Sequence, residues 1–452
     1  MNAVEIKSHM PPAHDFTVFV PVNWQLCRLK DKATFNPSKT EIKVIPSNCT
    51  FAPMEKLKTD LLLTDETTTF SEVSGSYTYF REGDILVAKV TPCFENRNIA
   101  IAKNLTNGVG FGSSEINVVR LTKKAHQRWF FYLFLSSYFV EAGASRMAGA
   151  GGLKRVPTLF LQTFSFALPP ICEQIAISTY LDTKTGEIDR KIDLLGRKAK
   201  QYDKLKQSLI NEIVSGGLDK SIPMKDSCVD WIGQVPEHWN LKRLKDLGYL
   251  YSGLAGKSGE DFTEEHINSS PFIPFTNIAN NFYLSIIDLK HVIIGSEEKQ
   301  NTIDKNDLFF LMSSEDFYDL GKSSLLLEKP AFPIYLNSFC KGYRFIKKDV
   351  DPRFINYLLH SSECRAALFN EGRGFTRINL RMNKINDISL CLPPTPEQTA
   401  IANYLDTKTS QINSIVTTIN TQIGQLTDLR KALINDVVTG KIKVVSGEGQ
   451  GS

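Results

Sequence analysis

Residues 168–218 read LPPICEQIAISTYLDTKTGEIDRKIDLLGRKAKQYDKLKQSLINEIVSGGL, and residues 392–442 read LPPTPEQTAIANYLDTKTSQINSIVTTINTQIGQLTDLRKALINDVVTGKI. Aligned without a gap at an offset of 224, the two segments share 21 identities in 51 positions. A repeat of this kind determines how a whole chain is divided, so it is considered before any single motif.

Each segment is predicted to form one long helix that begins after its two prolines. Proline fixes φ and lacks a backbone N–H, so the chain is extended at Leu-Pro-Pro and becomes helical only afterwards. Glu173 and Glu397 then fall in the first turn, where a carboxylate suits the helix dipole. We interpret each Glu-Gln pair there as a cap rather than as a catalytic pair. Gly216 and Gly440 stand where the helices should end. A helix over about 173–214 would be roughly 60 Å long.

Apolar residues in both segments recur with the 4-3 spacing of a coiled-coil seam. The first segment places Ile188, Ile192, Leu195, Tyr202 and Leu209 on this seam, and the second places Ile412, Val416, Ile419, Leu426 and Leu433 there. A base, Lys206 or Arg430, occupies the same position in both seams. Equal length and phase favour antiparallel pairing of the two helices over separate packing of each helix on its own domain.

A variable body of about 150 residues precedes each helix. The bodies share landmarks: VPVNWQLCRLKD at 20–31 resembles VPEHWNLKRLKD at 235–246, and RWFFYLFLSS at 128–137 resembles RFINYLLHSS at 353–362. They match only at such landmarks. Two divergent bodies on a duplicated scaffold indicate two related sites that recognise different things.

Both bodies are predicted to be mixed α/β (α+β) domains. Strands rich in β-branched and aromatic residues are expected at 83–90, 116–121, 307–312 and 342–346, and helices at about 126–142 and 352–370. The predicted fold is therefore two copies of an α/β domain, separated by two long helices in an antiparallel coiled coil, with an internal pseudo-twofold repeat.

A loop rich in glycine and basic residues follows each predicted body helix. The first contains Lys154 and Arg155, and the second contains Arg373 and Arg377. Glycine lets the backbone approach a ligand closely, and Arg or Lys bonds phosphate or guanine. An ordinary turn with solvated charges would look similar in sequence, and so would a solvated helix face for the bases around Arg381.

Composition and charge leave DNA binding open. Hydrophobic residues make up 42% and charged residues 23%, a normal globular mixture, and the net charge is +4. Residues 1–167 carry 19 basic and 14 acidic side chains, a net of +5, whereas residues 229–391 carry 19 and 21, a net of −2. The second body must therefore concentrate its bases locally if it contacts a DNA backbone.

Other patterns indicate a soluble cytoplasmic protein. The eight cysteines show no CxxC and no zinc spacing, which predicts reduced thiols and no metal site. The most apolar stretch, 129–140, is too short for a bilayer, which needs about twenty residues. The N-terminus has no apolar run and is not expected to be a signal peptide.

Catalytic motifs are not found. Only two residues separate the glycines in GLAGKS at 253–258, where a phosphate loop has four, and Glu41-Ile42-Lys43 lacks the surroundings of a metal site. A stand-alone DNA-modifying enzyme is thus disfavoured. A coiled-coil scaffold without a DNA role remains a second alternative.

At this point the chain resembles the specificity subunit of type I restriction-modification systems over roughly 20–445. The two Leu-Pro-Pro-x-x-Glu-Gln helices are the most specific marks, and Lys89-Val90-Thr91-Pro92-Cys93-Phe94-Glu95-Asn96 and Gly110-Phe111-Gly112-Ser113-Ser114-Glu115 look like segments of the family's target-recognition domains. The second body departs from this pattern, with Ser313-Ser314-Glu315 in place of Thr-Pro-Cys.

The resemblance implies a division of labour. Each target-recognition domain would read one half of a split double-stranded DNA site, and the helices would set the gap. Two methyltransferase subunits would dock and bring S-adenosylmethionine, and motor-nuclease subunits would bring ATP and Mg²⁺. This chain would bind no cofactor or metal of its own and would be non-catalytic.

The expected domains and contact residues follow. The domains are 1–167 (first target-recognition domain), 168–218 (first spacer helix), 219–391 (linker and second target-recognition domain), 392–445 (second spacer helix) and 446–452 (flexible tail). The candidate DNA-contacting residues are Lys89, Arg97, Ser113, Ser114, Lys154, Arg155, Ser313, Ser314, Arg373, Arg377 and Arg381.

Overall fold

The computed structural model describes residues 3–7, 17–149, 152–315, 319–371 and 378–444. The loop bases Arg373 and Arg377 and the expected tail 446–452 lie outside these residues. The chain forms two compact units: the first contains residues up to Gly196 and again from Asn420, and the second runs from Arg197 to Ile419. The units therefore divide the chain within the long helices, unlike the expected domains, because each unit takes in parts of both helices.

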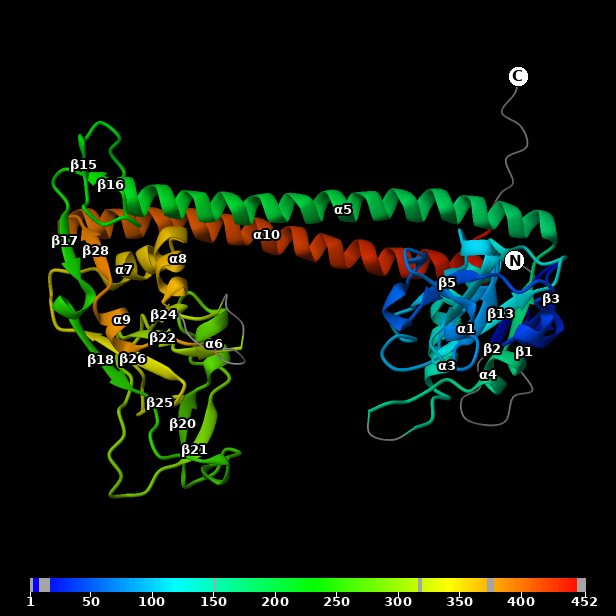
Figure 1. Cartoon of the computed structure of the whole chain (residues 1–452), viewed down its shortest axis with the longest axis horizontal. Helices are drawn as coiled ribbons and strands as arrows, with labels where there is room; N and C mark the ends of the chain where they lie inside the picture. Colours follow the sequence, from blue (N-terminus) through cyan, green and yellow to red (C-terminus); the bar gives the residue numbers. More distant parts are fainter. Residues whose placement is uncertain (1–2, 8–16, 150–151, 316–318, 372–377, 445–452) are drawn as a thin grey trace. The chain divides into compact units, whose positions relative to one another are not determined.

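The two repeat segments form the long helices α5 (Ile171–Gly216) and α10 (Thr395–Val438), coloured green and orange in Figure 1. Each begins directly after its prolines, as expected. The first helix ends on Gly216, but the glycine in the left-handed region is the next residue: Gly217 has a φ of +70° and donates its N–H to the Ile213 carbonyl at 3.0 Å. Only a residue without Cβ enters that left-handed region without strain, so the capping glycine lies one position later. In α10 the expected Gly440 does have a positive φ, +73°.

Each unit has an equivalent polar contact between α5 and α10. In the first unit Arg430 Nε lies 2.9 Å from Asp189 Oδ1, and in the second Lys206 Nζ donates to Asn413 Oδ1 at 3.0 Å. Asp189 and Asn413 are equivalent positions at the offset of 224, as are Lys206 and Arg430. The same contact is thus made twice. In the first unit the basic residue lies on α10 and its partner on α5, and in the second unit the basic residue lies on α5 and its partner on α10. Antiparallel pairing of two equivalent helices produces this reversal.

Two sheets form the body of the first unit. The first sheet has the order β11-β10-β13-β4, all antiparallel, and the second has the order β8-β5-β12-β9, in which β5 and β12 are parallel. The strands are β4 (Ala33–Phe35), β5 (Asn48–Ala52), β8 (Thr67–Thr69), β9 (Thr78–Arg81), β10 (Ile85–Ala88), β11 (Ile99–Ile101), β12 (Val109–Gly112) and β13 (Ile116–Leu121). The helices are α1 (Phe70–Val73), α2 (Gln127–Leu135), α3 (Ser137–Ala144) and α4 (Thr158–Thr163).

The second unit repeats the first sheet and alters the second. The order β24-β22-β26-β18 corresponds strand for strand to β11-β10-β13-β4, whereas the second sheet has the order β19-β21-β20-β25. The strands are β18 (Gly248–Ser252), β19 (Phe262–Thr263), β20 (Ser269–Ile273), β21 (Lys290–Ile293), β22 (Leu308–Leu311), β24 (Ser323–Leu325), β25 (Tyr335–Leu336) and β26 (Cys340–Phe345). The helices are α6 (Phe275–Asn280), α7 (Pro352–Leu359), α8 (Ser362–Asn370) and α9 (Met382–Asn386).

The parallel strand pair identifies where the second sheets differ. β20 and β25 are parallel, as β5 and β12 are, so β21 corresponds to β8. The counterpart of β9 is reduced to a single bridge between Thr302 and Tyr335. At the opposite edge the second unit gains β19, for which the described part of the first sheet has no counterpart.

Short elements complete both units. The two-stranded pairs are β1 (Ala3–Lys7) with β2 (Thr17–Pro21), β3 (Gln25–Arg28) with β14 (Ser165–Leu168), β6 (Leu57–Lys58) with β7 (Leu61–Leu62), β15 (Met224–Asp226) with β16 (Gln234–Pro236), β17 (Asn240–Arg243) with β28 (Ser389–Leu392), and β23 (Ser313–Ser314) with β27 (Ile378–Asn379). The 3₁₀ turns are η1 (Leu29–Asp31), η2 (Lys39–Glu41), η3 (Met54–Lys56), η4 (Thr106–Gly108), η5 (Leu244–Asp246) and η6 (Gly259–Asp261).

The single helices expected at 126–142 and 352–370 are each two helices. Ser136 has an extended backbone (φ −66°, ψ 148°), and its Oγ accepts the Phe139 N–H at 3.2 Å. Ser361 does the same before α8, accepting the Cys364 N–H at 3.2 Å. An extended serine that caps the next helix also ends the previous one.

Both helices contribute to the core of each body. In the first unit Trp129 and its neighbours pack with Leu181 near the start of α5 and with Val437 near the end of α10. In the second unit Trp239 packs with Val214 near the end of α5 and with Leu405 near the start of α10. Burial of these apolar side chains fixes each body to two helices rather than one. No helix in the described ranges is long and apolar enough to cross a membrane.

Candidate nucleic-acid interface

An ion pair between an arginine and a buried aspartate lies at the two central strands of the first sheet in both units. Arg120 donates from Nε and Nη2 to the two Asp84 carboxylate oxygens at 2.7 and 2.6 Å, and Arg344 makes the same pair of bonds to Asp307 at 2.9 and 2.6 Å. Burial acts to lower the pKa of Arg120, but the bond and charge of Asp84 outweigh it and raise the pKa. The bond to Asp307 likewise raises the pKa of Arg344. Each arginine is thus held in the fold by both oxygens of one buried carboxylate.

A second shared cluster joins each body to the start of a long helix. Asp182 of α5 accepts bonds from the Tyr132 hydroxyl and from Arg128 Nε, both at 2.6 Å. Its counterpart Asp406 of α10 accepts from the Tyr357 hydroxyl at 2.8 Å and from Arg353 at 3.1 Å. Each aspartate therefore fixes the direction in which the body leaves its helix.

The glutamines after Leu-Pro-Pro have a role that their sequence position did not show. Gln174 donates to the Pro169 carbonyl at 2.8 Å and accepts the His126 N–H at 3.1 Å. Gln398 repeats both bonds, to Pro393 and from Asp351, at 2.8 and 2.9 Å. The glutamines tether the body to the helix start and are not caps, because their side chains bond residues outside the helix.

Three segments of the first unit come together in one surface cluster, which we call the first loop cluster: 89–91, 113–115 and 152–155. Lys89 donates its N–H to the Glu115 carbonyl at 3.0 Å, and Ser113 Oγ accepts the Glu115 N–H at 3.1 Å. Thr91 exchanges bonds with Lys154, whose side chain is exposed. Five candidate residues, Lys89, Ser113, Ser114, Lys154 and Arg155, thus lie in one place.

An exposed ion pair closes the first loop cluster. Arg155 binds the Glu115 carboxylate through Nε and Nη2, both at 2.9 Å, and its side chain is 48% exposed. The bond from Arg155 lowers the pKa of Glu115. A pair in contact with water contributes little to stability, so phosphate or guanine can replace Glu115 at small cost.

Arg97 lies apart from this cluster. Its Nε donates to the Leu135 carbonyl at 2.9 Å and its Nη2 to Ser137 Oγ at 3.1 Å, so it bonds the end of α2. Burial lowers its pKa. The sequence identified Arg97 as a basic residue but could not show that its side chain bonds the Leu135 carbonyl.

In the second unit the candidate serines form β23 and pair with β27, Ser313 opposite Asn379. Arg381 follows this pair and is exposed at the start of α9. Arg365, which the sequence placed in the same basic group, instead donates to the buried Leu320 carbonyl at 2.7 Å, and burial lowers its pKa. Of these two basic residues, Arg381 therefore lies on the surface, whereas Arg365 is directed into the interior.

The expected seam residues lie along the two long helices with mixed burial. Ile412 and Ile419 are buried, at 7% and 5% exposed. The half-buried members are Ile188, Ile192, Leu195, Tyr202, Leu209, Val416, Leu426 and Leu433.

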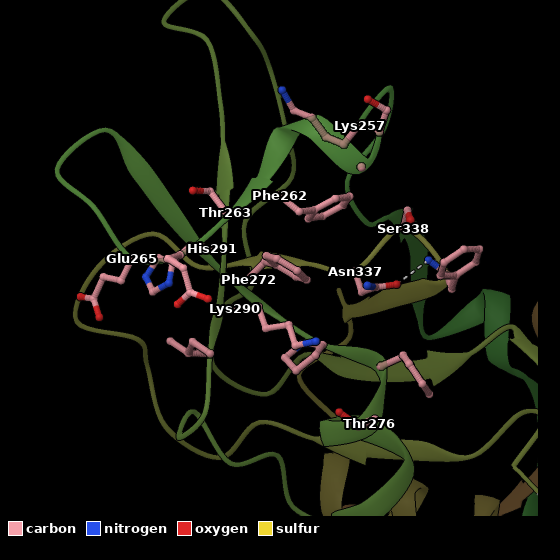
Figure 2. A pocket seen from close by; sticks show the side chains of 17 residues that line it. Lys257, Phe262, Thr263, Glu265, Phe272, Thr276, Lys290, His291, Asn337 and Ser338 are labelled. Carbon is pink, nitrogen blue, oxygen red and sulfur yellow. Dashed lines mark hydrogen bonds between the residues drawn. The ribbon is translucent and has the colours of Figure 1, made fainter. Parts of the chain in front are cut away.

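Sequence patterns did not show a cavity of about 1050 Å³ in the second unit (Figure 2). Its walls come from β19, β20, β21 and the turn 337–339. Lys257 of the glycine-rich segment lies at its edge, with Nζ 2.5 Å from Glu298, whose pKa this bond lowers to about 2. That lysine is therefore held by a carboxylate, unlike the lysine of a phosphate loop. No cluster of three His, Cys, Asp or Glu suited to a metal occurs among the residues described.

Comparison with known proteins identifies related sequences. A family model described as a type I restriction modification DNA specificity domain matches residues 236–425. The chain is 35% identical over 161 residues to the type I restriction enzyme EcoEI specificity subunit of Escherichia coli, covering 35% of this chain and 27% of the relative. It is 22% identical over 434 residues to the MjaVIII specificity subunit of Methanocaldococcus jannaschii, covering 94% of each. The match to the EcoEI subunit thus spans about a quarter of that relative.

Solved structures share the fold. A chain from a study of complex assembly and conformational transition in a type I restriction-modification system aligns with a TM-score of 0.72 at 16% identity, covering 94% of this chain and 99% of that one. The HsdS subunit from Thermoanaerobacter tengcongensis aligns with a TM-score of 0.51, also at 16% identity, covering 94% and 98%. At this identity the likeness concerns the fold alone.

Proposed function

We infer that this chain, a member of the family of type I restriction-modification specificity subunits, is the non-catalytic subunit that selects the DNA sequence. Each body acts as a target-recognition domain for one half of a split double-stranded site. The two long helices set the distance between the halves.

One observation supports two separate readers above all others. The units share their hydrogen-bonded framework at offsets of 223 to 225, including the Asp84–Arg120 and Asp307–Arg344 pairs, yet their second sheets differ. The two units keep the same framework but differ in one sheet. This is the arrangement expected of two domains that both bind DNA but select different base sequences. The first loop cluster offers two basic side chains that can bind DNA phosphates. Lys154 is exposed, and Arg155 can exchange its exposed ion pair with Glu115 for a phosphate.

Partner subunits would carry the chemistry. We assign S-adenosylmethionine to two methyltransferase subunits docked on the helices and bodies, and ATP and Mg²⁺ to motor-nuclease subunits. Restriction of DNA entering a cell places such a complex in the cytoplasm.

The test is the methylated motif in DNA from cells that carry this chain with its methyltransferase. We expect two short specific sequences separated by a fixed gap of unspecified bases. A single continuous motif would contradict two half-site readers.

Two alternatives predict other results. Methyl transfer or cleavage by the purified chain alone would establish a stand-alone enzyme. Absence of salt-dependent DNA binding, even with the methyltransferase present, would favour a scaffold without a DNA role.

A further inference from the structure

The cavity of the second unit is a product of the divergence between the two bodies. Its outer wall is β19, the strand that the second sheet gains, and its other walls are β20 and β21. A duplicated framework whose copies select different sequences must differ where it reads them. One wall, β19, has no counterpart in the described part of the first sheet, whereas the strands of the other two walls, β20 and β21, correspond to β5 and β8.

A backbone hydrogen bond also links the cavity rim to the segment that contains Ser313 and Ser314. The N–H of Met312, the residue between β22 and β23, donates to the carbonyl of Phe339 on the cavity rim at 3.2 Å. Met312 in turn accepts the N–H of Leu380, next to exposed Arg381. Met312 and Leu380 are buried, at 7% and 4% exposed, and their backbone bonds tie the segment of Arg381 and the serines to the cavity rim at Phe339.

The side chains in the cavity suit the edges of base pairs. The exposed fractions of Phe262, Phe275 and Phe339 are 36%, 46% and 49%, and Phe262 packs on Phe272 with ring centroids 5.4 Å apart. Figure 2 shows Lys290 near the middle of the cavity, with Glu265 and His291 at one end. Rings contact thymine methyl groups, a lysine binds phosphate, and a carboxylate accepts from the cytosine amino group.

We propose that this cavity is where the second domain reads its half of the DNA site, with Phe339 against a base edge and Lys290 on the backbone. The proposal rests on the proposed function and adds the surface and the residues that carry it out. The carboxylates of Glu264 and Glu265 repel phosphate. We therefore expect the DNA backbone to pass Lys290 and to lie at the end of the cavity away from these two glutamates.

The experiment uses the full chain assembled with its methyltransferase and random-sequence duplex DNA as the probe. Lys290→Ala should weaken binding several-fold and reduce the slope of log affinity against log salt by about one. Phe339→Ala should relax one base position by about tenfold, in one half-site only. The matched control is Lys305→Ala, because Lys305 is also exposed and lies just before β22, at the end opposite Met312.

Three results would separate the possibilities. Unchanged motif and salt slope in both cavity variants, with thermal melting as in the parent chain, would overturn the proposal while leaving two half-site readers intact. Equal loosening of both half-sites would overturn it as well, because the cavity belongs to one domain. A parent chain that selects no split motif would instead refute the proposed function itself.

Discussion

At the scale of single residues, the two copies of the framework differ at His360. Its first-unit counterpart at the offset of 225 is Leu135. The His360 ring bonds the Ser323 carbonyl at 2.8 Å and packs against Phe282, and burial lowers its pKa to about 4. The neutral imidazole thus fills an interior position that the first unit fills with a leucine.

This difference predicts a pH dependence of the second unit alone. A histidine whose pKa is depressed on folding contributes stability above its unfolded pKa of 6.5, and this stability is lost as the pH falls towards the folded value of about 4. We expect the free energy of unfolding of the second unit to drop across that window, by at most about 3 kcal/mol.

Hydrogen exchange of α7 and α2 peptides between pH 7 and pH 4 measures this loss. His360→Leu, which installs the first unit's residue, should remove most of the difference between the two units. An equal loss in both units of the parent chain would mean that carboxylates, not His360, dominate.

At the scale of elements, local signals predicted much of the fold. The long helices have their own start signal and a 3.5-residue period, and the strands at 85–88 and 116–121 are rich in β-branched residues. β19 has only two residues, Phe262–Thr263, and exists because β21 lies beside it. A strand of two residues is too short to have a hydrophobic alternation that could be recognised in the sequence. The cavity whose wall it forms could therefore not be predicted.

The candidate site was predictable to a similar depth. The candidate segments 89–91, 113–115 and 152–155 lie together through bonds that join Lys89 to Glu115 and Thr91 to Lys154, a proximity that the sequence did not predict. Arg97 and Arg365 could not be separated from surface bases by sequence, since each bonds a carbonyl that is distant along the chain. Base contacts stay a prediction for all the candidate residues.

The joint between body and helix yields an element-scale prediction. Asp406 accepts bonds from Tyr357 and Arg353, and its removal leaves Arg353 with only Asn403 and Tyr357 with only Thr409 as partners on α10. We expect Asp406→Ala to loosen the second body on its helix, so that the complex tolerates gaps one or two base pairs away from the preferred one. The bases preferred within each half-site should stay the same.

Gap tolerance is measured with duplexes that differ only in the number of bases between the half-sites. Asp182→Ala, the equivalent change in the first unit, should give the same broadening. A change in base preference rather than in gap tolerance would show that Asp406 acts on the DNA-contacting surface and not on the joint.

At the scale of the whole molecule, the duplicated contact between the long helices constrains how they can be altered. Asp189 with Arg430 and Lys206 with Asn413 set the register, so a change in one helix must be matched in the other. Seven residues are two turns and preserve the seam phase, whereas three or four shift the seam to another face.

Insertion of one heptad into α5 between Asp189 and Lys206, together with one into α10 between Asn413 and Arg430, should therefore lengthen the spacer without breaking its pairing. Seven residues add about 10 Å at about 1.5 Å each, close to three base pairs of about 3.4 Å. We expect the methylated motif to keep both half-sites and to gain about three bases in its gap. Insertion into α5 alone serves as the control, because it displaces Lys206 from Asn413 and should reduce binding rather than move the gap. If the doubly lengthened chain methylates with the parent gap, the helices do not measure the distance between half-sites, and the spacing must be set by the partner subunits.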